Sequence, residues 1–285
     1  MIESASGNKA FLSRKDDSSV PCVSSSSFWF PEYISPSGWL EHAPFAFWLI
    51  DEAKPKKMVE LGSHYGFSFF AFCQAIKRLR LPTVCYAVDT WVGDDHAGFY
   101  GEAVFNHVQS IQSTHYAQFS HLVRSTFDDA SNKVADGSVD LLHIDGRHAY
   151  DDALHDFTTW LPKVSDQGIV LFHDTRVYER GFGVFRLWDE LQKRYPNFEF
   201  HHGNGLGVIA VGKSMTPGIE ILFNASQEQQ RSIRDVYARL GASISQAHQL
   251  HVTTESLKIR EKELAQILVA VRELTEKLNP KKLVP

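Results

Sequence analysis

Three polar residues in the middle of the chain have the types and spacing that chemistry at a hydroxyl group needs. Asp145 and Asp174 each end a short apolar run, VDLLHID and GIVLFHD. If these runs are neighbouring strands, both carboxylates face one crevice and could bind a hard divalent cation through oxygen. His148 could act as a general base, because imidazole titrates near neutrality. Polar groups that converge at strand ends are costly to bury without a purpose, so the three together predict a functional site.

Two further histidines flank this group. His173 precedes Asp174 and is a third candidate metal ligand, although it could equally be a hydrogen-bonded residue at a strand end. His143 lies inside the VDLLHID run, and for it we favour the structural interpretation of a hydrogen-bonded core histidine.

A second candidate site is the segment ELGSHYGFS, which follows an apolar run and opens a helical pattern. Gly62 would permit a tight turn, and Gly66 would let the backbone approach a ligand at the helix N-terminus. The segment is not GxGxxG, so it offers no cradle for a pyrophosphate. A cofactor with an amino-acid end and no phosphates suits it better. Many strand–turn–helix corners contain two glycines, so the segment alone identifies no cofactor.

Asp89 ends the next apolar run, TVCYAVD. A carboxylate at that strand end can accept both hydroxyls of a ribose, in nicotinamide sites as in S-adenosylmethionine (SAM) sites. The alternative is a surface aspartate that caps the following helix.

The elements that position these residues alternate between strands and helices. This alternation predicts an α/β fold with a doubly wound, mostly parallel seven-stranded sheet. A short Gly-containing turn at 203–205 separates the last two strands, which should form an antiparallel hairpin. The expected strands cover 58–61, 83–89, 121–125, 139–145, 168–174 and a pair within 198–212, and the expected helices cover 66–80, 148–161 and 182–195.

Three regions are expected along the chain: a disordered leader over 1–27, a catalytic domain over 28–215, and a helical extension over 226–280. Within the domain, 39–53 predicts an aromatic-rich helix that must cover either the sheet or a partner subunit. In the extension, apolar residues recur in steps of three and four, which is coiled-coil spacing. We expect two helices or one interrupted helix there. Packing on the chain's own domain and self-association both remain open.

Composition excludes several classes of protein. The net charge of −5 gives no reason to expect nucleic acid. Three cysteines without a CxxC pair favour a reducing compartment, and no apolar window is long enough to span a bilayer. We therefore expect a cytoplasmic protein without a transmembrane segment.

Taken together, these motifs resemble those of a known family. ELGSHYGFS, Asp89, HIDGRHAYDDALHDFTTWLP, GIVLFHDT and GFGVFRLW, within about 58–212, resemble class I SAM-dependent O-methyltransferases of methyltransferase family 24. These are similar to catechol and macrolide-sugar O-methyltransferases, and relatives accompany glycosyltransferases in bacterial surface-polysaccharide pathways. The resemblance implies the class I methyltransferase fold.

The resemblance also implies roles for individual residues. Asp145 and His148 would be catalytic, with His148 as the base, and Asp145, Asp174 and His173 would be the metal ligands. Related metal sites often have two adjacent acidic or amide residues where this chain has His-Asp-Thr, so a weak, different or absent metal remains open. The methyl donor would be held by Glu60, Gly62, Ser63, Tyr65, Gly66, Ser68, Asp89, Thr90 and Asp145.

The expected activity is methyl transfer from SAM to a hydroxyl of a sugar, glycan or phenol, with Mg²⁺ or another divalent cation as a possible cofactor. Aromatic and histidine side chains could line the acceptor pocket or be ordinary packing residues; they are Tyr65, Trp91, His96, Tyr100 and Tyr178. We expect a homo-oligomer, formed through the aromatic helix or the C-terminal helices. The missing GxGxxG disfavours a nicotinamide oxidoreductase. The non-enzymatic alternative is a degenerate methyltransferase-fold scaffold that assembles through the C-terminal helices.

Overall fold

The computed structural model describes residues 20–94 and 98–278, and it contains a seven-stranded sheet in the order β5-β2-β1-β6-β7-β9-β8. The first five of these strands are parallel, whereas β9 runs antiparallel to both β7 and β8. This confirms the predicted α/β fold and its terminal hairpin. The strands are β1 (Lys57–Leu61), β2 (Val84–Asp89), β5 (Ser120–Arg124), β6 (Val139–Ile144), β7 (Val164–His173), β8 (Asn197–Phe200) and β9 (Leu206–Ala210). A separate two-stranded ribbon joins β3 (Gly93–Asp94) and β4 (Gly98–Phe99).

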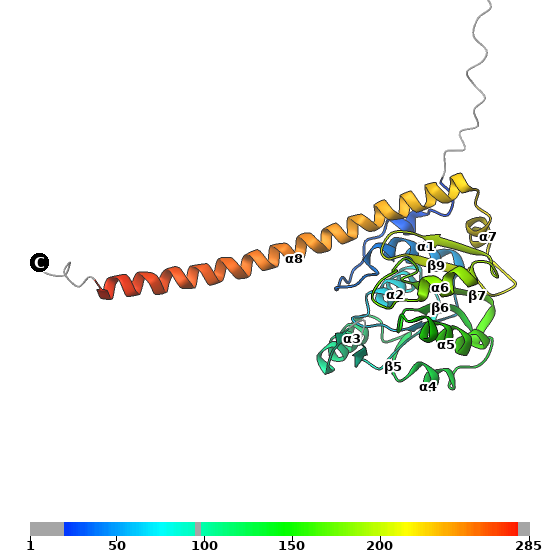
Figure 1. Cartoon of the computed structure of the whole chain (residues 1–285), viewed down its shortest axis with the longest axis horizontal. Helices are drawn as coiled ribbons and strands as arrows, with labels where there is room; N and C mark the ends of the chain where they lie inside the picture. Colours follow the sequence, from blue (N-terminus) through cyan, green and yellow to red (C-terminus); the bar gives the residue numbers. More distant parts are fainter. Residues whose placement is uncertain (1–19, 95–97, 279–285) are drawn as a thin grey trace, which may run out of the picture.

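Helices cover both faces of the sheet, which is why the central strands are apolar at consecutive positions. In β1, Met58 packs into the core on one face and Val59 into the core on the other. The first face carries α1 (Ala43–Ala53), α2 (Phe67–Leu79), α3 (Glu102–His115) and the start of α8 (Gln227–Leu278). The second carries α4 (Phe127–Ser131), α5 (Tyr150–Trp160) and α6 (Val184–Leu191). The short α7 (Pro217–Phe223) links the hairpin to α8 (Figure 1).

The predicted leader is too long at its C-terminal end. Residues 1–19 lie outside the described residues, but residues 20–27 belong to the folded body. Ser25–Phe28 is a 3₁₀ helix in which Ser26 and Ser27 are buried. The Ser27 hydroxyl lies 3.0 Å from the Tyr237 hydroxyl, which donates to the Cys22 carbonyl at 2.7 Å. Local composition carried no sign of this partner from the far end of the chain.

The aromatic helix α1 is covered by its own chain. It begins at Ala43 with Pro44 in its first turn, where the missing N–H costs little. Phe45, Phe47 and Leu49 are completely buried among α2, α8 and the sheet. The expected interface with a partner subunit through this helix is therefore wrong, because no apolar face is left for it to present.

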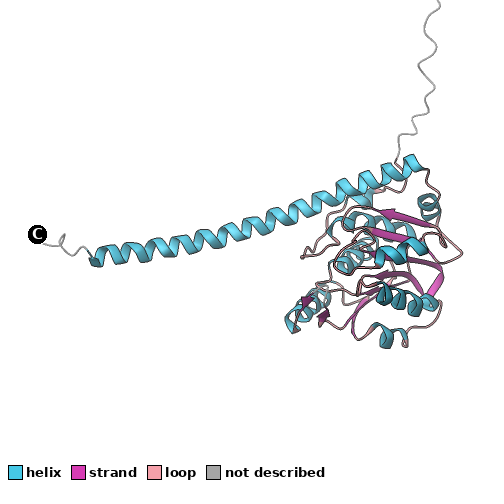
Figure 2. Ribbon diagram, viewed as in Figure 1, coloured by secondary structure: helices cyan, strands magenta, loops and turns pink. Residues whose placement is uncertain are grey.

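The C-terminal extension is one continuous helix of 52 residues, so the expected interruption is also wrong. Its first five turns lie on the body, and the rest projects away from it (Figures 1 and 2). No helix among the described residues has both the length and the apolar character to cross a membrane.

Candidate functional site

A cavity of about 410 Å³ opens at the carboxyl ends of β1, β2, β6 and β7. Parallel strands collect their C-terminal loops at one edge, and ligands of open α/β sheets bind there. The volume suits a nucleoside-sized ligand. Most of the predicted site residues line it: Gly62, Ser63, Tyr65, Ser68, Asp89, Thr90, Asp145, His148, His173 and Asp174. Glu60 and Gly66 are not among its lining residues.

Contacts within the protein itself explain both glycines of the first loop. Gly62 has φ +86°, and a Cβ there would lie 2.1 Å from the Asp145 carbonyl oxygen. The β1–α2 and β6–α5 loops can therefore touch only because residue 62 has no side chain. Gly66 has φ +78° and caps α2, and a Cβ there would press on the Phe70 ring at 2.8 Å.

Asp89 holds the loop that forms one wall of the cavity. Its Oδ2 accepts the backbone N–H groups of Ser63 and His64 at 2.9 and 3.0 Å, and its Oδ1 accepts that of Trp91 at 2.7 Å. A carboxylate offers about four acceptor positions, so about one remains for a ligand hydroxyl. Asp89 thus shapes the loop and still faces the cavity.

Glu60 lies behind this wall. Its Oε2 is 2.9 Å from His143 Nδ1, and both side chains are fully buried. The Ser63 hydroxyl donates to Glu60 Oε1 at 2.7 Å. Glu60 can therefore act on a ligand only by orienting Ser63, and His143 is the hydrogen-bonded core histidine that the sequence predicted.

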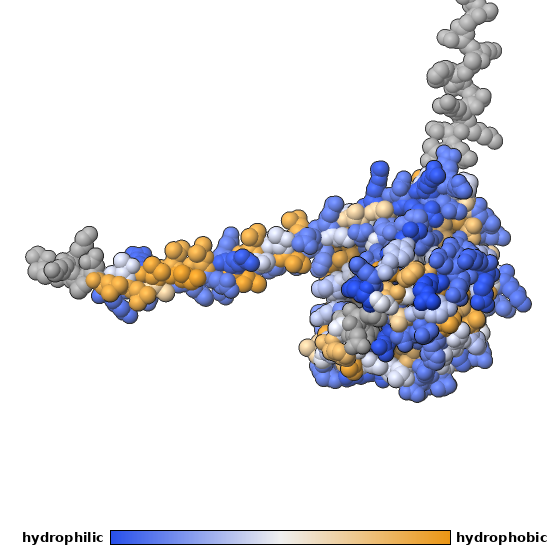
Figure 3. All heavy atoms as spheres, viewed as in Figure 1, coloured by the Kyte–Doolittle hydropathy of each residue, from blue (hydrophilic) through white to orange (hydrophobic). Residues whose placement is uncertain are grey.

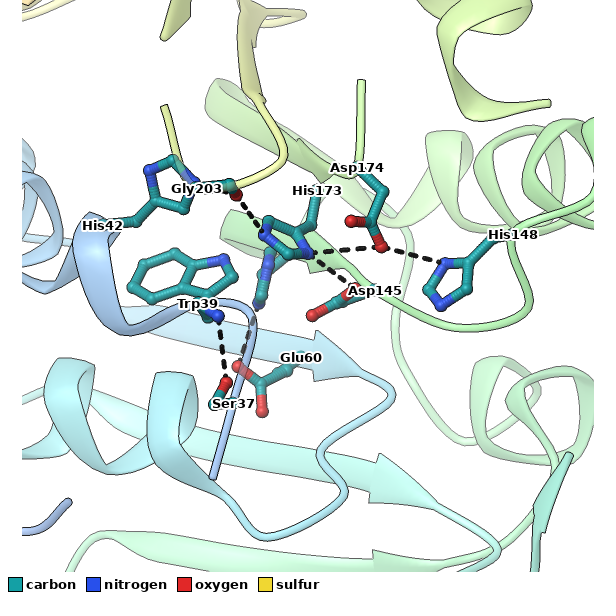
Figure 4. Close-up of polar contacts among 10 residues, drawn as sticks. Ser37, Trp39, His42, Glu60, Asp145, His148, His173, Asp174 and Gly203 are labelled. Carbon is teal, nitrogen blue, oxygen red and sulfur yellow. Dashed lines mark hydrogen bonds and ion pairs between the residues drawn. The ribbon is translucent and has the colours of Figure 1, made fainter. Parts of the chain in front are cut away.

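Four side chains from two adjacent strand ends form the polar floor of the cavity (Figure 4). His173 Nδ1 lies 3.3 Å from Asp145 Oδ1 and 3.4 Å from Asp174 Oδ2. Asp174 Oδ2 also lies 3.4 Å from His148 Nδ1. The two carboxylates and the two imidazoles thus alternate along one chain of contacts.

Electrostatics favour opposite charges within this floor. Burial alone would lower the pKa of His173, but the carboxylates of Asp145 and Asp174 raise it well above its usual value. Burial would raise the pKa of Asp145, yet the neighbouring imidazole of His173 holds it below its usual range. The favoured arrangement is an ionised Asp145 against a protonated His173.

His148 is fixed in a position from which it can reach a ligand. The Phe182 ring stacks on its imidazole with centroids 4.5 Å apart and planes 16° apart. The Gly183 N–H donates to its carbonyl at 2.7 Å. Its Nδ1 is directed to Asp174, and the other ring nitrogen points away from that carboxylate (Figure 4).

The same floor has a donor set for a metal ion. One ligand atom from each of Asp145, His148 and Asp174 lies within 4.8 Å of the others. Two carboxylate oxygens and one imidazole nitrogen fit a hard or borderline divalent cation. The sequence grouped His173 with the two aspartates, whereas the structure groups His148 with them. His173 instead lies where it can neutralise both carboxylates.

Several lining residues were not predicted from the sequence, and most of them come from loops remote from the predicted motifs. They are residues 36–39, Thr126, Phe127, Arg147, Arg180, Phe182 and Asn204. Arg147 and Phe182 lay within quoted motifs, yet nothing in the motifs singled them out.

Among the predicted acceptor residues, Tyr65 and Tyr100 line the cavity. Trp91 is buried and donates to the His64 carbonyl at 3.0 Å. Tyr178 is exposed and packs on Phe185. His96 lies outside the described residues.

The part of the chain that forms the cavity floor is similar to a known domain family. Residues 59–175 match the model of methyltransferase family 24, which is described as a methyltransferase domain. The match runs from within β1 to just beyond the end of β7 and includes every residue of the polar floor.

One curated relative is y4gI of Sinorhizobium fredii, an uncharacterized protein that is 47% identical over 202 residues. The alignment covers 70% of this chain but only 22% of that protein, so this chain spans about a fifth of its relative.

Solved structures with a similar arrangement are distant. A putative caffeoyl-CoA O-methyltransferase from Staphylococcus aureus is 16% identical, with 62% of this chain and 85% of that chain covered and a TM-score of 0.47. The O-methyltransferase TomG from Streptomyces achromogenes, solved with SAM, is 13% identical, with 64% and 83% covered and a TM-score of 0.46. Similarity at this level assigns no reaction to the present chain.

Proposed function

We propose that this protein is a SAM-dependent O-methyltransferase whose cavity holds SAM beside an acceptor hydroxyl. The observation that carries the proposal is that one cavity joins the Asp89 loop to the His148–Asp174 pair. The Asp89 loop would hold a nucleoside with an amino-acid end, and the His148–Asp174 pair would take a proton from a hydroxyl. The match of residues 59–175 to a methyltransferase domain supports the same reaction.

The residues present fit SAM. Ser63 in the β1–α2 loop and Ser68 in the first turn of α2 would hold its amino-acid end, because this loop lacks the glycine pattern of a pyrophosphate site. The remaining acceptor position of Asp89 would take a ribose hydroxyl. Thr126 and Phe127 lie across the cavity beside Gly146, where a flat base could lie. When bound, SAM supplies an electrophilic methyl group on its sulfonium.

His148 is proposed as the general base. With Nδ1–H directed at Asp174, Nε2 is the atom that would accept the proton of an acceptor hydroxyl. Asp174 favours this tautomer and stabilises the imidazolium that forms, and Phe182 fixes the plane of the ring. Positioning the oxygen against the methyl group contributes much of the remaining acceleration.

A divalent cation at Asp145, His148 and Asp174 is a further part of the proposal. It would lower the pKa of an acceptor hydroxyl and neutralise the alkoxide. Because His148 is one of the three possible ligands, it would then bind the metal instead of serving as a base. The two versions differ in their response to chelation.

The proposed acceptor is a hydroxyl of a sugar or glycan. The proposed compartment is the cytoplasm, because the three free cysteines favour a reducing environment. Support for the sugar comes from the family resemblance and from Tyr65 and Tyr100 in the cavity wall, which could stack on a sugar ring.

Calorimetric titration of SAM and S-adenosylhomocysteine into the full chain tests the cofactor, after chelation and again with Mg²⁺. We expect micromolar binding, weakened at least tenfold by Asp89→Asn and unchanged by Asp136→Asn on the surface. A parallel titration with NAD should show no heat of binding. Absence of SAM binding under both metal conditions would instead favour the non-enzymatic alternative, a methyltransferase-fold scaffold that assembles through α8.

A further inference from the structure

The helix α8 carries two separate apolar stripes. The first consists of Ile233, Tyr237, Gly241 and Ile244, which are buried on the body. At Gly241 the contact is between backbones, since a Cβ there would lie 2.2 Å from the Glu41 carbonyl oxygen. These residues follow the spacing of a straight helix, three or four residues apart. The body-facing stripe ends at Ile244.

Beyond Ile244 the same line of the helix is polar. At 3.6 residues per turn it continues through His248, His251, Glu255 and Lys258. No apolar side chain therefore extends the contact with the body. Every residue over 249–278 is exposed.

A second stripe begins on a different side of the helix. Leu250, Leu257, Leu264, Val271 and Leu278 follow each other at intervals of seven. Leu250 is six residues after Ile244, which turns it about 120° away from the body-facing line. We call the five residues, together with Ile267 and Leu274, the distal seam. Each is between 53% and 83% exposed. Figure 3 shows apolar side chains gathered along this projecting part of α8.

The projecting part needs a partner. Thirty residues of helix reach about 45 Å. A helix without tertiary contacts is marginal in water, and its stability normally comes from packing an apolar face. A strict interval of seven is the repeat that keeps an apolar line in contact with a second, supercoiled helix.

We propose that the distal seam packs against the same seam of a second copy of this chain, so that the protein is a dimer held by a coiled coil. The two seams fit each other because each copy presents the same apolar residues at the same interval. The charges also permit the pairing. Residues 249–278 contain five acidic and five basic side chains, so the segment has no net charge and two copies of it do not repel each other.

The contact should be strongest toward the C-terminal end. A coiled coil has a second core position three residues after each residue of the seven-residue series. These positions hold Thr253 and Arg260 in the first half of the projecting helix, and Ile267 and Leu274 in the second half. Only the second half therefore has apolar residues at both core positions of the heptad.

Sedimentation equilibrium of the full chain tests the proposal. We expect twice the chain mass of 32.3 kDa at micromolar concentration. The double variant Leu264→Glu/Val271→Glu places charges in the core of the seam and should sediment as a single chain. The matched control Val252→Glu/Ile259→Glu makes the same chemical change on the opposite side of the helix and should remain a dimer.

A single-chain mass for the unmodified protein at tens of micromolar would overturn the proposal, as would a seam variant that stays dimeric. Titration of SAM into both variants separates this outcome from the proposed function. Because the cavity lies on the body, SAM binding should be equal in the two variants whether or not they associate.

Discussion

Two pairs of histidine and carboxylate lie within this one domain and behave differently. Glu60 and His143 are partners across the β1–β6 ladder, 2.9 Å apart and fully buried. His148 and Asp174 lie beyond the strand ends, 3.4 Å apart and 14% and 7% exposed. The tighter pair is sealed inside the protein, and the looser pair opens into the cavity. Access to ligand therefore separates a structural pair from the pair proposed to be catalytic, although both use the same residue types.

The largest expected effect is on the open pair. His148→Gln should lower kcat by about 10²- to 10⁴-fold, because the proton acceptor is lost. SAM affinity and the melting temperature should change little, since the His148 side chain is partly exposed at the cavity and glutamine keeps a polar group there. The measurement is release of S-adenosylhomocysteine with the best acceptor from a panel of sugars, nucleotide sugars and catechols. An active His148→Gln would remove the open pair from catalysis.

The sealed pair should respond in the opposite way. Glu60→Ala leaves His143 and the Ser63 hydroxyl without their buried acceptor, which should cost about 3–5 kcal/mol of unfolding free energy. Denaturant unfolding measures this, and Glu60→Gln is the matched control because it keeps an acceptor of the same shape. A stable Glu60→Ala protein that had lost only catalysis would reverse the comparison.

A smaller effect is expected at Asp156, a buried carboxyl on α5. Burial raises its pKa from 3.8 to about 7. The folded state thus keeps a proton that the unfolded state has lost, and this contribution to stability is present below pH 3.8 and lost as the pH rises through 7.

Asp156→Asn removes that dependence. The variant should be more stable than the parent at pH 8 by about 2–4 kcal/mol and nearly equal to it at pH 4. Urea unfolding at the two pH values measures the difference. The same difference at both pH values would show that ionisation of Asp156 is not the cause.

The fold was predictable because its signals are local. Buried parallel strands are short apolar runs, and the Gly-containing turn at 203–205 marks the hairpin. Helix α3 was missed because EAVFNHVQSIQSTH is mostly polar and only Val104 and Val108 are buried. The continuity of α8 was not predicted because the apolar spacing weakens between about 250 and 256, although 242–278 contains no glycine or proline.

The candidate site was predictable where residues end strands and not where loops meet. Asp89, Asp145 and Asp174 follow apolar runs, so topology alone brings them to one edge. Residues 36–39 and Thr126 reach the same cavity from loops whose paths no periodicity encodes. Glu60 sits at the end of a strand as well, but its side chain turns to His143, and only the packing decides which way a strand-end side chain points.

The projecting helix also has a mechanical consequence. Where α8 leaves the body, the Ser245 hydroxyl donates to Glu41 at 2.9 Å, and Glu41 belongs to the short 3₁₀ helix Leu40–His42. The Gly203 carbonyl accepts from His42 at 2.9 Å and from His173 at 3.1 Å. A tilt of about 10° at this fulcrum would swing the far end of a 45 Å arm through about 8 Å. A force on the arm would therefore reach Glu41 first, and the adjacent His42 shares the Gly203 carbonyl with His173, which lines the cavity.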